Sequence, residues 1–162
     1  MKKLVVFYSL SGNTEIVAKT IAKELKADLY RVEEIRKRNR FLAYLTGGFA
    51  AMRDKCSEIK PVALNVHDYD LIFLGSPIWA SKPVPAINAF ISSTDFKHKK
   101  VIAFFTMGGS GYEKAINNIT VKVEKRSGKV IDSFAIRVSR KSSDAIVKET
   151  KKATKSHLRH LS

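Results

Sequence analysis

Short runs of apolar residues alternate along the chain with longer segments in which apolar residues recur every three or four positions. The short runs predict five β-strands, because continuous apolar stretches are typical of strands covered on both faces. These strands are expected at residues 3–8, 29–32, 71–75, 101–105 and 130–138. The longer segments predict amphipathic helices. These helices are expected at residues 13–26, 83–91, 112–123 and 143–160.

The regular alternation of strands and helices indicates the fold class. Strand–helix–strand units make successive strands parallel, and their right-handed crossovers place helices on both faces of the sheet. We therefore predict an α/β fold, a three-layer α/β/α sandwich around a five-stranded parallel sheet, as a single domain over residues 1–162. Asp132 interrupts the apolar alternation of the last strand, which places that strand at an edge.

Two segments depart from this regular order. Pro83 and Pro85 both suit the first turn of the helix expected at 83–91. Proline lacks a backbone N–H, and the N–H groups of a first helical turn have no acceptor within the helix. Residues 36–62 form a longer basic segment that contains the pair Gly47-Gly48, and a short helix is expected within it.

The composition is that of a globular chain with a substantial core. With 44% hydrophobic residues, 162 residues can bury such a core without cross-links. Cys56 is the only cysteine, which excludes an internal disulfide framework and a paired-cysteine zinc site; we expect it to be a partly buried structural thiol. A reducing, cytoplasmic location is the simplest interpretation. No run approaches the roughly 18 apolar residues of a membrane span.

The net charge is the unusual feature of the composition. The chain has 30 Lys and Arg against 15 Asp and Glu, a formal net charge of +15. Such a charge attracts nucleic acid, anionic lipid, acidic proteins or anionic metabolites. Residues 121–162 are strongly basic but hold one aromatic residue, Phe134, which is expected to be buried. Because base-stacking surfaces need exposed aromatic rings, no specific nucleic-acid binding is predicted, whereas peripheral contact with an anionic surface agrees with the charge.

Three strand ends carry hydroxyl groups or glycine at the place where such a sheet binds ligands, outside the carboxyl ends of its strands. The first end leads through Ser9–Thr14 into the helix expected at 13–26. A helix start offers free N–H groups and a positive dipole, Gly12 allows close approach, and the hydroxyls donate hydrogen bonds. We therefore predict a phosphate cradle here. In the simpler alternative, Ser11 or Asn13 only caps the helix.

The other two loops suit the ring of a ligand. Trp79, the only tryptophan, follows the strand at 71–75 and is interpreted as a wall beside a flat ligand, with a core tryptophan as the alternative. Gly108, Gly109 and Gly111 let backbone amides line a ligand edge, although they also fit a flexible turn. A phosphate cradle, an aromatic wall and an amide-lined edge together favour flavin mononucleotide (FMN).

The motifs that other nucleotide-binding, phosphorelay, catalytic and metal sites require are missing from the sequence. Neither a P-loop nor a Gly-x-Gly-x-x-Gly fingerprint follows the first strand, and Asp70 precedes the third strand, unlike the acidic cluster of a phosphorelay receiver. No residue is convincing as a general acid, base or nucleophile. His157 and His160 alone have a ligand-like spacing, and they are expected to complement the dipole at the end of the closing helix. No catalytic residue and no metal ligand is therefore assigned.

Across the three loops the chain resembles the flavodoxin family. The resemblance is carried by Tyr8–Thr14, Tyr69–Trp79 and Phe105–Gly111. It implies the strand order 2-1-3-4-5, non-covalently bound FMN and one- or two-electron redox chemistry. The resemblance implies that the phosphate is bound by Ser9, Ser11, Gly12, Asn13 and Thr14. It implies that the isoalloxazine ring lies along Ser76, Pro77, Ile78, Trp79 and Ala80. It implies that the far edge of the ring meets Thr106, Gly108, Gly109, Ser110 and Gly111.

Three functions remain open at this point. The first is an FMN-binding redox protein that carries electrons between protein partners, with an acidic docking surface expected on the partner. The alternative is an FMN-dependent NAD(P)H oxidoreductase acting on quinones or similar small acceptors, in which basic residues such as Lys82 attract the pyridine nucleotide. The third is a module that kept the fold, lost the flavin and binds nucleic acid or an acidic partner.

Overall fold

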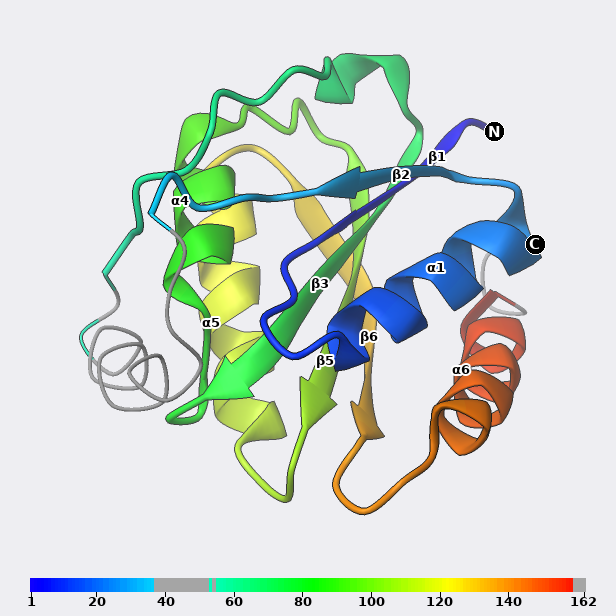
Figure 1. Ribbon diagram of the computed structural model, residues 1–162. Coiled ribbons are helices and arrows are strands. Elements are labelled where there is room, and N and C mark those ends of the chain that lie inside the picture. The colour runs from blue at the N-terminus through cyan, green and yellow to red at the C-terminus, as the bar shows by residue number, and fades with distance from the viewer. Residues whose placement is uncertain (37–52, 54, 159–162) are drawn as a thin grey trace.

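A computed structural model describes residues 1–36, 53 and 55–158 of the chain (Figure 1). Its centre is a parallel sheet whose main strands run in the order β2-β1-β3-β5-β6. Their bounds are Lys3–Phe7 for β1, Asp28–Arg31 for β2, Leu71–Trp79 for β3, Lys100–Met107 for β5 and Lys129–Arg137 for β6. Counted without the two-residue strand β4, this order is 2-1-3-4-5, and the predicted fold class is confirmed.

In the described part of the chain, two helices cover each face of the sheet. One face carries α1 (Asn13–Leu25) and α6 (Ser143–Leu158), and the other carries α4 (Pro85–Ser93) and α5 (Tyr112–Glu124) (Figure 1). Side chains of β1 point alternately to the two layers, as the pleat of a strand requires. Leu4 and Val6 belong to the core beneath α4 and α5, whereas Val5 and Phe7 belong to the core beneath α1 and α6. The sandwich therefore has an apolar core on each side of its sheet.

The third strand is longer than predicted and ends in a hairpin. It extends to Trp79, and β4 (Lys82–Pro83) folds back antiparallel to it. Ala80 and Ser81 form the two-residue turn, with φ angles of 48° and 61°. A tight hairpin requires such left-handed values, although neither residue is the Asn or Gly that usually signals the turn.

The hairpin corrects the predicted start of the next helix. Pro83 pairs with Ile78 in β4, so the prediction that it lies in a first helical turn is wrong. Only Pro85 is helical, at the start of α4, where no N–H is needed. Proline is tolerated in β4 because that strand pairs with β3 alone and its other side needs no donor.

The last strand, β6, forms an edge of the sheet, as the interruption at Asp132 predicts. Its register with β5 shifts around Ile131, which is the extra residue of a bulge. A hydrogen bond of 2.6 Å joins Asp132 Oδ2 to His157 Nδ1 of α6, and the His157 ring stacks on Phe134. His157 therefore ties α6 to the edge strand, whereas His160 lies outside the described residues.

The segment between β2 and the short 3-10 helix η2 (Val66–Asp68) is described only in part. Residues 37–52 and 54, which include most of the region where a short helix is expected, lie outside the described residues. Cys56 is exposed, so the prediction of a partly buried thiol is wrong. The reason is that the irregular chain around Cys56 runs over the surface of α4, where its Sγ lies 3.8 Å from Ser92 Oγ. In the described part of the chain, no helix combines the length and apolarity needed to cross a membrane.

Candidate functional site

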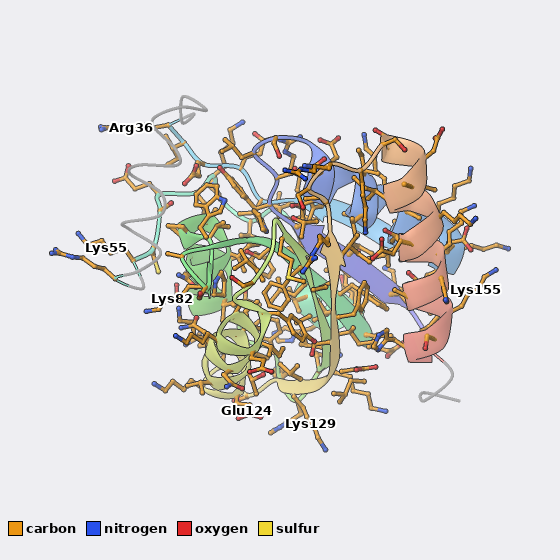
Figure 2. The ribbon with its side chains drawn as sticks, turned by 90° about the horizontal axis from the view of Figure 1, so that it is seen from below. Arg36, Lys55, Lys82, Glu124, Lys129 and Lys155 are labelled. Carbon is orange, nitrogen blue, oxygen red and sulfur yellow. The ribbon has the colours of Figure 1, made fainter. Side chains whose placement is uncertain are left out.

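The carboxyl ends of β1, β3 and β5 meet at one edge of the sheet. The three strands are neighbours and run in the same direction. The arrowheads of β3, β5 and β6 point to the lower side of Figure 1, which is the side that Figure 2 faces. The three loops predicted to bind a ligand, residues 9–14, 76–81 and 106–111, therefore lie next to one another at this edge.

The first loop leaves the start of α1 without a side-chain cap. Gly12 is the N-cap residue, and no side chain accepts a hydrogen bond from the first turn. Within the described residues, the N–H groups of Asn13, Thr14 and Glu15 have no acceptor. The alternative in which Ser11 or Asn13 caps the helix is therefore wrong. Free N–H groups at the positive end of a helix dipole suit an anion.

The space in front of Gly12 is open. A Cβ atom placed on Gly12 would meet nothing within 4 Å, and its φ of 97° is a left-handed value that glycine adopts without strain. Ser9 shapes the loop from beneath, because its buried Oγ accepts a hydrogen bond from the Gly12 N–H at 3.1 Å. The loop thus has room for phosphate oxygens in front of its backbone donors.

Thr14 joins the first loop to the third. The residue is 2% exposed, and its Oγ1 lies 2.7 Å from Thr106 Oγ1 at the end of β5. Because only one of the two hydroxyls donates in this bond, the other keeps its hydrogen for a further acceptor. The pair therefore fixes the two loops to each other and leaves one donor for a ligand.

The Glu15 carboxylate lies beside the phosphate cradle, and two positively charged side chains compensate its negative charge. Glu15, in the first turn of α1, pairs with Lys19 at 2.7 Å and with Arg31 Nη1 at 2.9 Å. The hydrogen bond from Lys19, assisted by the Arg31 charge, lowers the pKa of Glu15, although partial burial opposes the shift. Arg31 also donates from Nη2 to the Ser9 carbonyl at 3.0 Å. Sequence reasoning missed Arg31, because it comes from β2 and reaches this loop only through the pairing of β2 with β1.

In the second loop, Ser76 serves the fold. It is fully buried, and its Oγ accepts a hydrogen bond from the Val84 N–H at 3.0 Å while donating to the Pro77 carbonyl at 2.8 Å. Its hydroxyl therefore holds the end of β3 against the chain that enters α4. Because the whole residue is buried, a contact between Ser76 and a ligand stays a prediction.

Trp79 is half-buried at the end of β3. Its ring lies edge to face against Tyr8, with centroids 6.2 Å apart, and it packs on the core beneath α4 and α5. Ala80, the next residue, is exposed at the tip of the hairpin. Trp79 therefore covers this core while remaining half-buried beside Tyr8, and its role as a wall beside a flat ligand stays a prediction.

The third loop packs against the hairpin. Gly111 approaches Ser81 so closely that a Cβ atom on Gly111 would lie 2.9 Å from the Ser81 Cα. The φ of Gly111 is 98°, a second reason why this position needs glycine. The second and third loops are therefore in direct contact at Ser81 and Gly111.

Two side chains from the end of β6 hold the third loop from its other side. Arg137 Nη2 donates to the Gly109 carbonyl at 3.1 Å, and Ser139 Oγ donates to the Gly108 carbonyl at 2.7 Å. In a trans peptide the C=O and N–H point in opposite directions, so the N–H groups of Gly109 and Ser110 face away from β6. Neither Arg137 nor Ser139 belongs to a sequence motif, and nothing in the sequence pattern singles them out.

A cavity of about 470 Å³ lies between the hairpin turn, the third loop and the first turn of α5. Its volume is in the range of small-molecule sites, about 300–1,000 Å³. Its lining includes Ser81, Ser110, Tyr112 and Lys114 but no residue of the first loop. The cavity and the phosphate cradle are therefore separate parts of the same edge.

Comparison with known proteins identifies the family. The sequence model for flavodoxin matches residues 2–150. The chain belongs to the flavodoxin family. It is 26% identical over 137 residues to the flavodoxin-like domain-containing protein BilS of Clostridioides difficile, covering 83% of this chain and 64% of that protein. It is 30% identical over 109 residues to the uncharacterized protein MJ0298 of Methanocaldococcus jannaschii, covering 67% of this chain and 55% of that protein.

Both curated relatives are longer than the part they share with this flavodoxin-family chain, which spans less than two thirds of either one. A solved flavoprotein from Lactobacillus acidophilus, in complex with FMN, is similar in structure. Its TM-score is 0.73 at 24% identity, over 93% of this chain and 98% of that one. At this identity the likeness concerns the fold.

The structure gathers the predicted site residues at one edge and links all three loops. Thr14 contacts Thr106, Gly111 contacts Ser81, and Tyr8 lies against Trp79. Which of the predicted residues contact FMN stays a prediction.

Proposed function

We propose that this chain is a redox protein that carries electrons between protein partners. FMN is its cofactor as a member of the flavodoxin family. Bound FMN supplies the chemistry, because it accepts and returns one or two electrons. The observation that carries the proposal is the uncapped start of α1 at the mouth of β1, which fits a phosphate monoester.

The first task of the chain is to bind that phosphate. Three N–H groups that find no acceptor among the described residues, together with the space that those residues leave open before Gly12, form the receiving surface. A hydrogen bond to a charged group contributes about 1.5–3 kcal/mol. Residues 9–14 contain no Lys or Arg, so backbone dipoles and hydroxyls hold the dianion, and Arg31 adds positive charge from behind the loop.

Replacing Arg31 with glutamine is expected to weaken FMN binding about fivefold. The change removes the donor to the Ser9 carbonyl and one of the two positive charges that compensate the Glu15 carboxylate beside the phosphate. Fluorescence titration with FMN measures the effect. Lys23→Gln is the matched control, since Lys23 is an exposed residue of α1 and its replacement removes the same charge. Equal affinity in the two variants would show that Arg31 acts only through net charge.

The second task of the chain is to orient the ring. Trp79 provides an aromatic surface that Tyr8 holds in place. The N–H groups of Gly109 and Ser110 face away from β6. Among the described residues, no side chain crowds Gly108 or Gly109, where a Cβ atom would meet nothing within 4 Å. An aromatic wall on one side and backbone donors on another fit a flat, heteroatom-edged ring.

The residue types of the three loops favour electron transfer over catalysis. Residues 9–14, 76–81 and 106–111 contain no Asp, Glu, His, Lys, Arg or Cys. Side chains of these loops can therefore bind, orient and shield a ring, but they offer no ordinary general acid or base. Electron transfer to a docked protein needs only those functions and an accessible edge.

Basic side chains flank the loops and favour an acidic partner. Lys114 lies in the first turn of α5 next to the acidic Glu113, and Arg137 lies at the end of β6; all three are exposed, so two positive charges stand against one negative charge here. Opposite charge on a partner would steer its approach to this edge and speed association.

The second candidate function, an NAD(P)H oxidoreductase acting on quinones or similar acceptors, is favoured by one observation. The cavity of about 470 Å³ beside the third loop could admit a small molecule, and Lys114 lines it. Mixing the FMN-loaded protein with NADPH or NADH under anaerobic conditions separates the two functions.

For an electron carrier, we expect the flavin absorption near 450 nm to persist for minutes with either pyridine nucleotide alone. It should bleach within seconds when a flavoprotein reductase is added in catalytic amount. Stopped-flow absorbance is the measurement. Complete bleaching within seconds by NADPH or NADH alone would contradict the carrier and support the oxidoreductase.

A further inference from the structure

Lysine occupies the outer surface of the helical layer formed by α1 and α6. Between residues 13 and 26, the exposed positions are Lys19, Lys23 and Lys26 and no others. In α6 from residue 148 onward, the exposed positions are Lys148, Lys151, Lys152, Lys155 and Ser156. A solvated helix surface normally mixes both signs of charge. Exposed positions that are almost all lysine therefore suit a negatively charged partner.

The carboxylates of these two helices mostly take part in ion pairs with only three of the nearby lysines. Glu15 pairs with Lys19, Glu24 with Lys151 at 3.3 Å, and Glu149 with Lys141, while Asp144 lies apart in the first turn of α6. The remaining lysines make no ion pair with any described residue, and we call them the lysine face. The lysine face consists of Lys23, Lys26, Lys148, Lys152 and Lys155.

The lysine face extends over two neighbouring helices. Lys148, Lys152 and Lys155 follow the i, i+4, i+7 spacing that aligns side chains along one helix surface, and Lys23 and Lys26 stand three residues apart. The two helices pack together on the same face of the sheet (Figure 1), and packed helices lie about 8–10 Å apart. Figure 2 shows Lys155 on the outer side of α6. The charges therefore form a two-dimensional array instead of a single line.

We propose that the lysine face binds the surface of an anionic lipid bilayer. A bilayer with mobile charged headgroups can place a negative charge beside each lysine of such an array, and each lysine near such a surface strengthens binding about fivefold. The contact is electrostatic, because none of the large apolar side chains exposed in the described part of the chain lies on α1 or α6. This inference goes beyond electron transfer and does not depend on the flavin.

A nucleic acid fits the lysine face less well. Residues 13–26 and 143–158 contain no Phe, Tyr or Trp to stack on bases and no Arg to form paired hydrogen bonds with a phosphate.

Bound in this way, the molecule would keep its redox edge accessible. Helices α1 and α6 cover a face of the sheet, whereas the three loops lie at the carboxyl edge (Figure 1). Because α1 and α6 run opposite to the strands that precede them, Lys26 and Lys155 lie toward the end of the molecule away from the loops. A protein partner could therefore approach the flavin edge along the membrane.

Co-sedimentation with vesicles tests the proposal. Wild-type protein is mixed at 50 mM salt with vesicles of phosphatidylcholine alone or with 30% phosphatidylglycerol. We expect binding to the anionic vesicles only, with or without FMN. The triple change Lys148→Gln, Lys152→Gln, Lys155→Gln is expected to weaken this binding about 100-fold. A rise to 300 mM salt should weaken the wild-type binding by a similar factor or more, because surface charges are then screened.

The matched control removes three lysines from another part of the surface. Lys100, Lys125 and Lys129 are exposed and lie outside α1 and α6, at the starts of β5 and β6 and at the end of α5. Their replacement by glutamine gives the same net charge and is expected to weaken vesicle binding less than fivefold. Equal losses in the two triple variants, or no wild-type binding to anionic vesicles, would overturn the proposal. Tighter binding to a 30-base-pair duplex than to the vesicles would assign the lysine face to nucleic acid instead. Far-ultraviolet circular dichroism checks that each variant is folded. The single change Lys152→Glu is a second variant, and it is also expected to weaken binding to the anionic vesicles.

Discussion

Replacing Gly75 with alanine is expected to lower the free energy of unfolding by about 3 kcal/mol. Gly75 lies in β3, directly opposite Phe104 of the neighbouring strand β5. A Cβ atom at Gly75 would lie 2.0 Å from Phe104 Cζ, far inside any allowed contact. The Phe104 ring is fully buried and stacks on Phe134, with centroids 6.1 Å apart, so it cannot move aside without disturbing its neighbour. The added methyl group therefore forces the core beneath α1 and α6 to repack.

Thermal unfolding followed by circular dichroism measures this effect. For a chain of this size, about 3 kcal/mol corresponds to a fall in Tm of roughly 6–12 °C. Gly108→Ala is the control, because a Cβ atom there would meet nothing within 4 Å, and its Tm should stay within about 2 °C of the wild type. A Gly75→Ala protein as stable as the control would show that the core around Phe104 has space that the structure does not contain.

Removing the phosphate from the ligand is expected to weaken binding by at least about 100-fold. Riboflavin has the same ring and ribityl chain as FMN but leaves the cradle at Gly12 empty. The N–H groups of Asn13, Thr14 and Glu15 would then lose their acceptor, since the described structure offers them no other. Each hydrogen bond to a charged group contributes about 1.5–3 kcal/mol, so a net loss of about 3 kcal/mol or more is a modest expectation.

Much of the fold could be predicted from the sequence because the central strands are buried on both faces. The run at 71–75 is entirely apolar up to its glycine, as a strand between two helical layers must be, and the structure has β3 there. The hairpin after β3 could not be predicted. Ala80 and Ser81 lack the usual turn signal, and only the packing of Ser81 against Gly111 explains why the chain holds their left-handed angles.

Part of the candidate site could likewise be predicted from the sequence, and part could not. The first loop could be predicted, because a glycine among hydroxyls between a strand and a helix is a local pattern. The supports of the loops could not, because Arg31, Arg137 and Ser139 are distant in sequence from the carbonyls that they hold. Cys56 shows the same limit, since its exposure depends on where an irregular segment crosses α4.

The central claim is that the uncapped start of α1 binds the phosphate of FMN through main-chain N–H groups. The most direct test is to titrate the flavin-free wild-type protein with FMN and, separately, with riboflavin, following the quenching of flavin fluorescence at fixed pH and salt. We expect FMN to bind at least about 100-fold more tightly than riboflavin. Equal dissociation constants for the two ligands would contradict the account, because they would show that the cradle at Gly12 contributes nothing to recognition.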